Sequence, residues 1–335
     1  MPSLHSSTTP SGSDSALEEV LAIVTRSGYQ FITPTPMTHQ RVFARSTCRV
    51  GTTLRDVFGW NLPFAAPAIA GDLLAAMARA QILLPDGELW RSGVRIASID
   101  ADLFLHSAFP TVQTDAVFFG PDTYRFGCFV RHALRQSRLS APGDATIPEP
   151  VRVLDVGCGS GAGGVVAARK LAQQGLAVEL VCNDINPLAL SYAAINTRNA
   201  GIPAQMALGD ALDAVQGQFD VIISNPPYLD DLAQRAYRHG GGRLGSGLSM
   251  RIAAGALSRL APGGRLLLYT GVAIVDGHDA FLADLRPLLA ASGCDWTYDE
   301  IDPDVFGEEL DQPGYAHVER IAAVGLIATR HAAGS

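Results

Sequence analysis

The chain has 335 residues, of which 47% are hydrophobic, so it is long enough for two domains with a substantial core. Its net charge is −8, and neither half is basic: residues 1–150 hold 12 Arg and 13 acidic residues, and residues 151–335 hold 13 Lys and Arg and 20 acidic residues. This charge balance disfavours an extended nucleic-acid surface, so we expect nucleic acid to be an unlikely partner.

Cysteine spacing and hydropathy disfavour further classes of protein. The five cysteines lie far apart and form no CxxC pair, so we expect neither a metal site nor a disulfide framework. The N-terminus lacks the basic and apolar pattern of a signal peptide, and no apolar run reaches the length of a membrane span. We therefore expect a cytoplasmic protein with no membrane segment, and the sequence leaves its oligomeric state open.

The N-terminal part of the chain predicts a small domain of its own. Residues 1–15 are rich in Ser, Thr, Pro and Gly, and we expect a disordered tail. Residues 16–114 predict a helix over 16–27, a helix over 71–84, and β-type runs around a turn at Ser92-Gly93. This pattern favours a mixed α+β, winged-helix-like domain. Its near-neutral charge favours a substrate-docking or lid role over nucleic-acid binding.

The segment before the glycine-rich motif predicts a second helix-bearing region that begins at residue 115. Residues 115–138 indicate the end of a strand, a turn at Gly120-Pro121, and a helix capped by Asp122 or Thr123. Residues 140–150 have the composition of a linker.

Residues 151–161, VRVLDVGCGSG, predict a buried strand followed by a glycine loop and a helix. The three glycines at 157, 159 and 161 permit a tight turn and a close approach by a ligand. Asp155 lies just before the first glycine. Because a carboxylate repels phosphate and attracts a cation, Asp155 suits an ammonium group better than a pyrophosphate.

From residue 151 onward, strand and helix patterns alternate, which predicts a doubly wound α/β fold with a parallel sheet. The expected strands are 151–156, 177–182, 204–208, 219–224 and 264–269, the expected helices are 187–199, 248–260 and 279–292, and a hairpin of 295–301 and 318–329 closes the sheet. Asp155, Asp184, Asp210 and Asn225 all fall at the carboxyl ends of strands, where such sheets bind ligands. We therefore expect one shared site.

The tetrapeptide Asn225-Pro226-Pro227-Tyr228 carries the most specific chemistry. An amide or aromatic amine nitrogen is a poor nucleophile because its lone pair is delocalised. The Asn225 side-chain oxygen and the Pro226 carbonyl oxygen can accept hydrogen bonds from the N–H groups of this nitrogen and draw the nitrogen towards tetrahedral geometry. The prolines stiffen the loop, and Tyr228 offers a flat face for stacking.

Together the glycine loop and the Asn-Pro-Pro-Tyr motif resemble the class I S-adenosylmethionine (SAM) methyltransferases that modify a planar nitrogen. From about residue 115 to 270 the chain is similar to the release-factor glutamine methyltransferases and their relatives in the small-methyltransferase group. The likeness includes Pro121-Asp122-Thr123, the run from Asn183 to Leu190, Gly241-Gly242, and Pro262-Gly263-Gly264. It implies a seven-stranded, Rossmann-like SAM-binding catalytic domain over residues 115–335.

The resemblance also implies a set of site residues. The catalytic residues would be Asn225, Pro226 and Tyr228, and the cofactor-binding residues would be Asp155, Gly157, Gly159, Gly161, Asp184, Ile185, Asp210, Ala211 and Asn225. Asp155 would attract the amino group of SAM, Asp184 would accept from the ribose hydroxyls, and Asp210 would accept from the adenine amino group. No metal is implied.

The leading hypothesis is a SAM-dependent N-methyltransferase acting on an amide-type nitrogen of a protein or small molecule. The alternatives are an adenine-N6 methyltransferase on RNA or DNA, a non-methylating enzyme that transfers or cyclises the aminobutyryl arm of SAM and releases methylthioadenosine, and a SAM-binding scaffold. The chain departs from the resembling family in its long N-terminal part and in an acidic insertion from Asp302 to Tyr315. That insertion is either a solvated loop or a segment that covers or selects the substrate.

Overall fold

The computed structural model describes residues 12–45, 50–135, 149–231, 235 and 237–332. The chain divides into two compact units, Met1–Thr111 and Val112–Ser335. The sequence places the corresponding boundary after residue 114. The predicted disordered tail lies outside the described residues over 1–11, and so does most of the predicted linker. Each unit is described separately.

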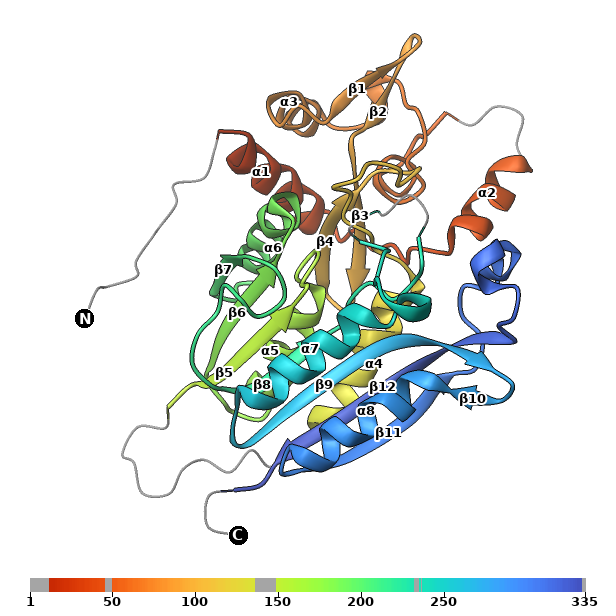
Figure 1. Ribbon diagram of the computed structural model, residues 1–335. Helices are drawn as coiled ribbons and strands as arrows, with labels where there is room; N and C mark the ends of the chain where they lie inside the picture. Colours follow the sequence, from red (N-terminus) through yellow and green to blue (C-terminus); the bar gives the residue numbers. More distant parts are fainter. Residues whose placement is uncertain (1–11, 46–49, 136–148, 232–234, 236, 333–335) are drawn as a thin grey trace. The chain divides into compact units, whose positions relative to one another are not determined.

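The first unit combines short helices with two β-hairpins (Figure 1). Its elements are α1 (Gly12–Arg26), α2 (Pro36–Ala44), a π-helical turn (Arg55–Gly59), a 3-10 turn (Ala66–Ala68), α3 (Gly71–Arg79), β1 (Leu83–Asp86), β2 (Leu89–Ser92), β3 (Val94–Ile99) and β4 (Asp102–Ser107). Strands β1 and β2 form one antiparallel pair, and β3 and β4 form another. The unit is therefore mixed α+β, while its winged-helix character stays a prediction.

Three local predictions for the first unit need correction. Helix α1 begins at Gly12, so residues 12–15 are helical rather than part of a disordered tail. Helix α3 ends at Arg79 instead of 84, because Gln81 takes a left-handed conformation with φ of 59° and the chain turns into β1. The hairpin turns fall between β1 and β2 and between β3 and β4, so Ser92-Gly93 separates the two hairpins instead of closing one.

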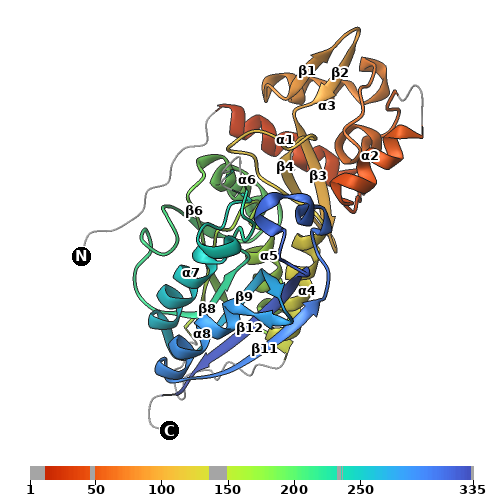
Figure 2. The same ribbon diagram turned by 45° about the vertical axis from the view of Figure 1, so that its right-hand side comes forward.

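The second unit holds a large sheet covered by helices (Figure 2). Its elements are α4 (Pro121–Arg135), β5 (Val151–Val156), α5 (Ala162–Ala172), β6 (Val178–Asp184), α6 (Pro187–Asn199), β7 (Ala204–Leu208), β8 (Phe219–Ser224), a 3-10 turn (Arg243–Gly245), α7 (Gly247–Ser258), β9 (Leu260–Val275), β10 (His278–Asp279), α8 (Ala280–Ala291), β11 (Cys294–Asp302), 3-10 turns at Gly307–Asp311 and Pro313–Tyr315, and β12 (Arg320–Arg330).

The strand order of the sheet is β11-β12-β9-β8-β5-β6-β7, with the short β10 paired to β9. Strands β5 to β9 run parallel, and β12 runs antiparallel between β9 and β11. Successive strands are added on one side of β5 and then on its other side, so the sheet is doubly wound and β5 marks its switch point. The predicted Rossmann-like sheet is confirmed. It places the end of β5 where such folds bind ligands.

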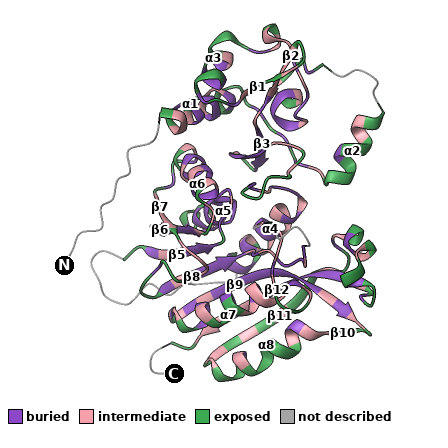
Figure 3. Ribbon diagram, turned by 45° about the horizontal axis from the view of Figure 1, so that its top comes forward, coloured by how far each residue is buried: buried purple, intermediate pink, exposed green. Residues whose placement is uncertain are grey.

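The core of the second unit follows from the residue pattern of its elements. Strand β8 is buried along almost its whole length, as expected for a strand covered on both faces. Helix α8 buries Phe281, Leu285 and Leu289, spaced four residues apart, and leaves its other side exposed (Figure 3). The edge strand β11 alternates between half-buried and exposed residues. The burial pattern therefore sets each element's place in the sheet and its layers.

Candidate active site

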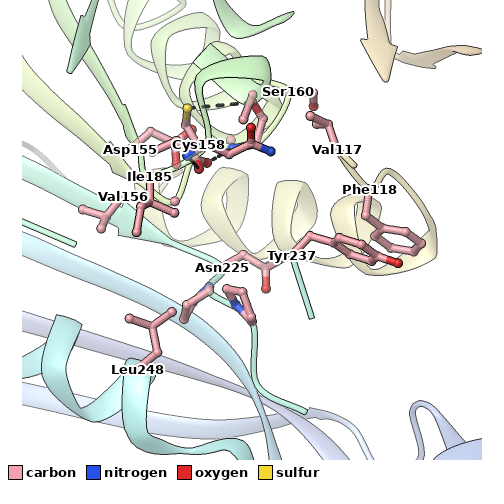
Figure 4. Close-up of a pocket in the computed structure, with 18 of the residues that line it drawn as sticks. Val117, Phe118, Asp155, Val156, Cys158, Ser160, Ile185, Asn225, Tyr237 and Leu248 are labelled. Carbon is pink, nitrogen blue, oxygen red and sulfur yellow. Dashed lines mark hydrogen bonds between the residues drawn. The ribbon is translucent and has the colours of Figure 1, made fainter. Parts of the chain in front are cut away.

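A cavity of about 190 Å³ lies in the second unit at the carboxyl ends of β5, β6 and β8. Its walls include nearly all of the predicted site residues, namely Asp155, Gly157, Gly159, Asp184, Ile185, Asp210, Ala211, Asn225, Pro226 and Tyr228. Figure 4 shows Asp155 and Ile185 on one side and Asn225 on another. The predicted site residues, from Asp155 to Tyr228, therefore meet in one cavity.

Gly161 is the one predicted site residue that does not line the cavity. It precedes α5 with φ of 77°, a conformation that favours glycine. A Cβ atom at Gly161 would lie 3.1 Å from the Cβ atom of Ala193 in α6. The structure therefore gives Gly161 a packing position between α5 and α6. Gly157 and Gly159 also have positive φ, and they do form the cavity wall.

Asp155 is a buried carboxyl group at the end of β5. Its Oδ2 atom accepts a hydrogen bond of 2.7 Å from the backbone N–H of Gly164 near the start of α5. Burial raises the pKa of Asp155 to about 7, against the lowering effect of the Gly164 N–H, and the nearby charge of Asp184 raises it further. A cationic group entering the cavity would favour the ionised form of this carboxyl group.

Asp184 ties the glycine loop to the end of β6. Its two oxygens accept hydrogen bonds of 2.9 Å from the backbone N–H groups of Gly159 and Asn186. Burial raises its pKa, and these backbone N–H groups oppose the shift. Each carboxylate oxygen has a second lone pair, so Asp184 can still accept a hydrogen bond from a hydroxyl group of a ligand.

Asp210 occupies a different environment from the other two acids. Its carboxylate is half-exposed and accepts hydrogen bonds of 2.6 and 2.8 Å from the guanidinium group of Arg251 in α7. The sequence does not indicate this partner, because Arg251 lies 41 residues further along the chain. A ligand amino group would share the Asp210 carboxylate with Arg251.

The tetrapeptide directly follows β8 and is tightly packed. The hydroxyl group of Tyr228 donates a hydrogen bond of 2.7 Å to Asp122, and its ring lies against Gly271 of β9. A Cβ atom at Gly245 would lie 2.2 Å from the carbonyl oxygen of Tyr228, and one at Gly240 would lie 2.7 Å from that of Pro227. Gly240 and Gly245 therefore let the backbone pack directly on the tetrapeptide.

Asp122 is a site residue whose role the sequence does not predict. It is predicted as a helix cap, but α4 begins at Pro121, and the Thr123 hydroxyl oxygen accepts from the Gly120 N–H at 3.3 Å. The buried Asp122 carboxylate instead accepts hydrogen bonds from Tyr228 and, at 2.5 Å, from Tyr269.

The surroundings of Asp122 connect it to the tetrapeptide in two places. Burial raises the pKa of Asp122, and hydrogen bonds from Tyr269, Tyr228 and the Asn225 side chain oppose this shift, as does the charge of Arg125. Asp122, at the start of α4, therefore contacts both β9 and the tetrapeptide. The Pro-Asp-Thr run in the resemblance is the sequence feature that points to it.

The cavity wall also includes side chains that were not predicted as site residues, among them Phe118, Tyr237, Arg238 and Phe306. The rings of Phe118 and Tyr237 stack with centroids 6.1 Å apart, and Figure 4 shows them side by side. Phe306 belongs to the acidic insertion, which is therefore part of the cavity wall. Nothing in the sequence specifies these contacts, because each depends on how distant loops meet.

The described parts of the chain contain no group of three or more His, Cys, Asp or Glu residues arranged to hold a metal ion. Over the same residues, no helix is both long and apolar enough to span a membrane.

Comparison with known proteins shows which families part of the chain resembles. Residues 145–272 match the family model of the methyltransferase small domain. The chain is 31% identical over 175 residues to a release factor glutamine methyltransferase of Koribacter versatilis, covering 48% of this chain and 57% of that protein. A release factor glutamine methyltransferase of Deinococcus radiodurans is 34% identical over 174 residues, covering 48% and 56%. The chain thus spans little more than half the length of these relatives.

Shorter and more distant likenesses were also found. A ribosomal RNA small subunit methyltransferase C of Shewanella loihica is 44% identical over 81 residues, which is 24% of this chain and 22% of that protein. The solved structure of TYW2 from M. jannaschii in complex with AdoMet aligns at a TM-score of 0.45 with 14% identity, covering 74% of this chain and 92% of that one. That TM-score is too low to support an inference.

Residues 145–272 of the second unit are therefore similar to the methyltransferase small domain, and the cavity lies at the switch point of their doubly wound sheet. Methyltransferases of this class use SAM as their cofactor. The residues present fit the cofactor. Asp155 is a buried carboxyl group suited to an ammonium, and the buried Asn183 in the cavity wall has a side-chain oxygen with no hydrogen-bond partner among the described residues.

Proposed function

We propose that this protein transfers a methyl group from SAM to a planar, amide-type nitrogen of a protein or small molecule. The observation that carries the proposal is the shared cavity. Asn225, at the carboxyl end of β8, lines the same cavity as Asp155 and Asp184. The side chains suited to a cationic nucleoside and those suited to a planar nitrogen are therefore within one site.

Several residues of the second unit would hold the cofactor. Asp155 would take the amino group, Asp184 the ribose hydroxyls, and Asp210 with the Ala211 N–H the adenine. The glycine loop at 157–159 would allow the backbone to approach closely. When bound, SAM supplies a methyl group that its sulfonium already activates. The protein therefore needs to position the acceptor and stabilise charge, with no strong base required.

The tetrapeptide would prepare the acceptor nitrogen. The Asn225 side-chain oxygen and the Pro226 carbonyl oxygen would accept its N–H groups, so that its lone pair becomes less delocalised and can attack. Asp122 supports this arrangement because the oxygens of its carboxyl group accept hydrogen bonds, as they do from Tyr228 and Tyr269. An Asn225 amide that turns its NH₂ group towards Asp122 leaves its oxygen for the acceptor. The hydrogen bond from Tyr228 to Asp122 fixes the ring beside the same position.

Adenine-N6 methylation of RNA or DNA is the second candidate, since the relative from Shewanella loihica is named as a ribosomal RNA methyltransferase. The tetrapeptide chemistry suits an exocyclic amine equally well. Two features favour an amide in a protein or small molecule: the net charge of −8 and the longer matches to enzymes named for glutamine. For the first unit we propose the substrate-docking or lid role that its composition suggests.

The first test is mass spectrometry of the nucleoside products after incubation with SAM, with and without a lysate of the source cell. S-adenosylhomocysteine (SAH) that forms only with lysate supports methyl transfer and allows the acceptor to be fractionated. Methylthioadenosine that forms from SAM alone overturns the proposal and makes SAM itself the substrate.

The second test is Asn225→Ala. We expect at least a hundredfold loss of methyl transfer, as when one positioned polar group is removed from other active sites, while SAM affinity changes little. Gln205→Ala, which removes an exposed amide from β7, is the control and should transfer normally. Undiminished transfer in Asn225→Ala would contradict the assigned role.

A further inference from the structure

The acidic insertion between β11 and β12 is fastened to the chain that follows the tetrapeptide. The guanidinium group of Arg238 donates to the carboxylate of Glu309, which is buried. The backbone N–H of Asp230 donates a hydrogen bond of 2.7 Å to the hydroxyl oxygen of Tyr315. The two segments therefore form one wall, and the insertion is more than a solvated loop.

A further ion pair fixes the start of the insertion. The Nε atom of Arg125 in α4 lies 2.8 Å from Oδ2 of Asp302. Arg238 also lies within 3.7 Å of Asp231, so two carboxylates surround its guanidinium group. Breaking a partly buried pair leaves a charge without compensation, so these contacts hold the insertion in one position.

Phe306 is the residue of the insertion that reaches the cavity. Its ring packs edge-on against Tyr228 of the tetrapeptide, with centroids 5.8 Å apart and planes at 72°. The guanidinium group of Arg238 lies over the Phe306 ring at 5.9 Å. The backbone of Phe306 has φ of 54° and ψ of 40°, which a bulky residue rarely adopts. Such strain persists only where the surroundings impose it, here the contacts on both sides of the insertion.

We propose that Phe306 is a specificity-determining residue, whose ring, held beside Tyr228 by the Arg238–Glu309 pair, sets the width of the acceptor end of the cavity. The inference rests on the proposed function in one respect, namely that the tetrapeptide end of the cavity receives the acceptor. With the ring in place, a single carboxamide fits beside Asn225 and a fused two-ring base is excluded. Removing the ring opens this end without touching the SAM-binding acids.

The test measures binding, so it does not depend on knowing the natural acceptor. Protein saturated with SAH is titrated with N-acetylglutaminamide and with 9-methyladenine, and binding is followed by ligand-observed NMR. The main variant is Phe306→Gly, because glycine adopts the same positive φ without strain. Phe306→Leu, which keeps apolar bulk, is the second variant. Glu308→Gln, an exposed neighbour in the insertion, is the control.

We expect Phe306→Gly to bind 9-methyladenine at least about tenfold more tightly than the wild type, the scale on which apolar pockets discriminate by size. Phe306→Leu should fall between the two, and Glu308→Gln should match the wild type. Equal 9-methyladenine binding by wild type and Phe306→Gly would overturn the inference. SAH affinity and the thermal transition of each variant show whether it is folded.

The proposed function can fail separately from this inference. If SAM gives no SAH with lysate while Phe306→Gly still gains 9-methyladenine binding, the methyl-transfer proposal fails and the inference about Phe306 is supported. If methyl transfer occurs and both probes bind Phe306→Gly as they bind the wild type, the inference about Phe306 is refuted and the methyl-transfer proposal is supported.

Discussion

Gly271 of β9 offers a test of how precisely the Tyr228 ring must lie. A Cβ atom at this position would be 2.2 Å from Cε2 and 2.3 Å from Cδ2 of Tyr228. Ordinary contact needs about 3.4 Å or more, so in Gly271→Ala the ring must move by at least about 1 Å. Tyr228 is buried and its hydroxyl group is bonded to Asp122, so the ring cannot move without disturbing that contact.

We expect two effects of Gly271→Ala. Overpacking of the core should lower the free energy of unfolding by about 1–3 kcal/mol. A displacement of about 1 Å at a positioning residue should reduce methyl transfer by roughly a hundredfold. SAM affinity should change by less than about threefold, because Gly271 is not among the residues that line the cavity.

The assays are chemical denaturation, SAM titration calorimetry, and SAH formation with SAM and the source-cell lysate. Gly127→Ala in α4 is the control, because a Cβ atom there meets only Val166 at an ordinary 3.7 Å. Combining Gly271→Ala with Tyr228→Ala should show non-additive losses of stability, since the truncated side chain no longer meets the new methyl group. A Gly271→Ala variant with wild-type stability and transfer would refute the reasoning.

Three other predictions follow from the site. Burial raises the pKa of Asp155 to about 7, well above that of an unfolded Asp, so the folded state resists ionisation of this group. The free energy of unfolding of the wild type relative to Asp155→Asn should therefore fall as pH rises from about 4 to about 7 and level off above. Chemical denaturation at several pH values measures this difference. Asp184→Ala should weaken SAM binding in calorimetry more than Asp210→Ala does, because Asp184 also holds the glycine loop while Asp210 is half-exposed; the reverse order would contradict the proposed roles. Tyr228→Phe and Tyr269→Phe should each cost about 1–3 kcal/mol of unfolding free energy, the range for removing one partner of a buried hydrogen bond, but only Tyr228→Phe should impair methyl transfer, because Tyr269 does not line the cavity.

The parts of the fold that sequence predicts best are those with local causes. The predicted bounds of α6, β7 and β8 agree with the structure at 187–199, 204–208 and 219–224. Helix α6 begins with Asn186 capping its first turn and Pro187 as its first residue, both of which are local features. Strand β8 carries the apolar run Val221-Ile222-Ile223, typical of a parallel strand buried on both faces.

Strand β9 shows where local reasoning fails. The sequence predicts 264–269, whereas the strand extends over Leu260–Val275. The local sequence Pro262-Gly263-Gly264 predicts a turn before the strand. The strand is extended because it pairs with β8 on one side and over ten residues with β12 on the other. Such pairing depends on a partner strand about 50 residues away, which no local pattern specifies.

The sequence by itself determined the doubly wound sheet and the site residues that lie at its strand ends, because alternating apolar runs, glycines and a Pro-Pro turn act over a few residues. Tertiary structure alone decided the rest of the cavity. Asp122 meets Tyr228 and Tyr269 across 106 and 147 residues, and Phe306 meets Tyr228 from the insertion. An aspartate beside a helix start has the same local sequence whether it caps the helix or turns inward. Which it does depends on the polar groups that the folded chain brings to it, since a buried carboxyl group needs hydrogen-bond partners.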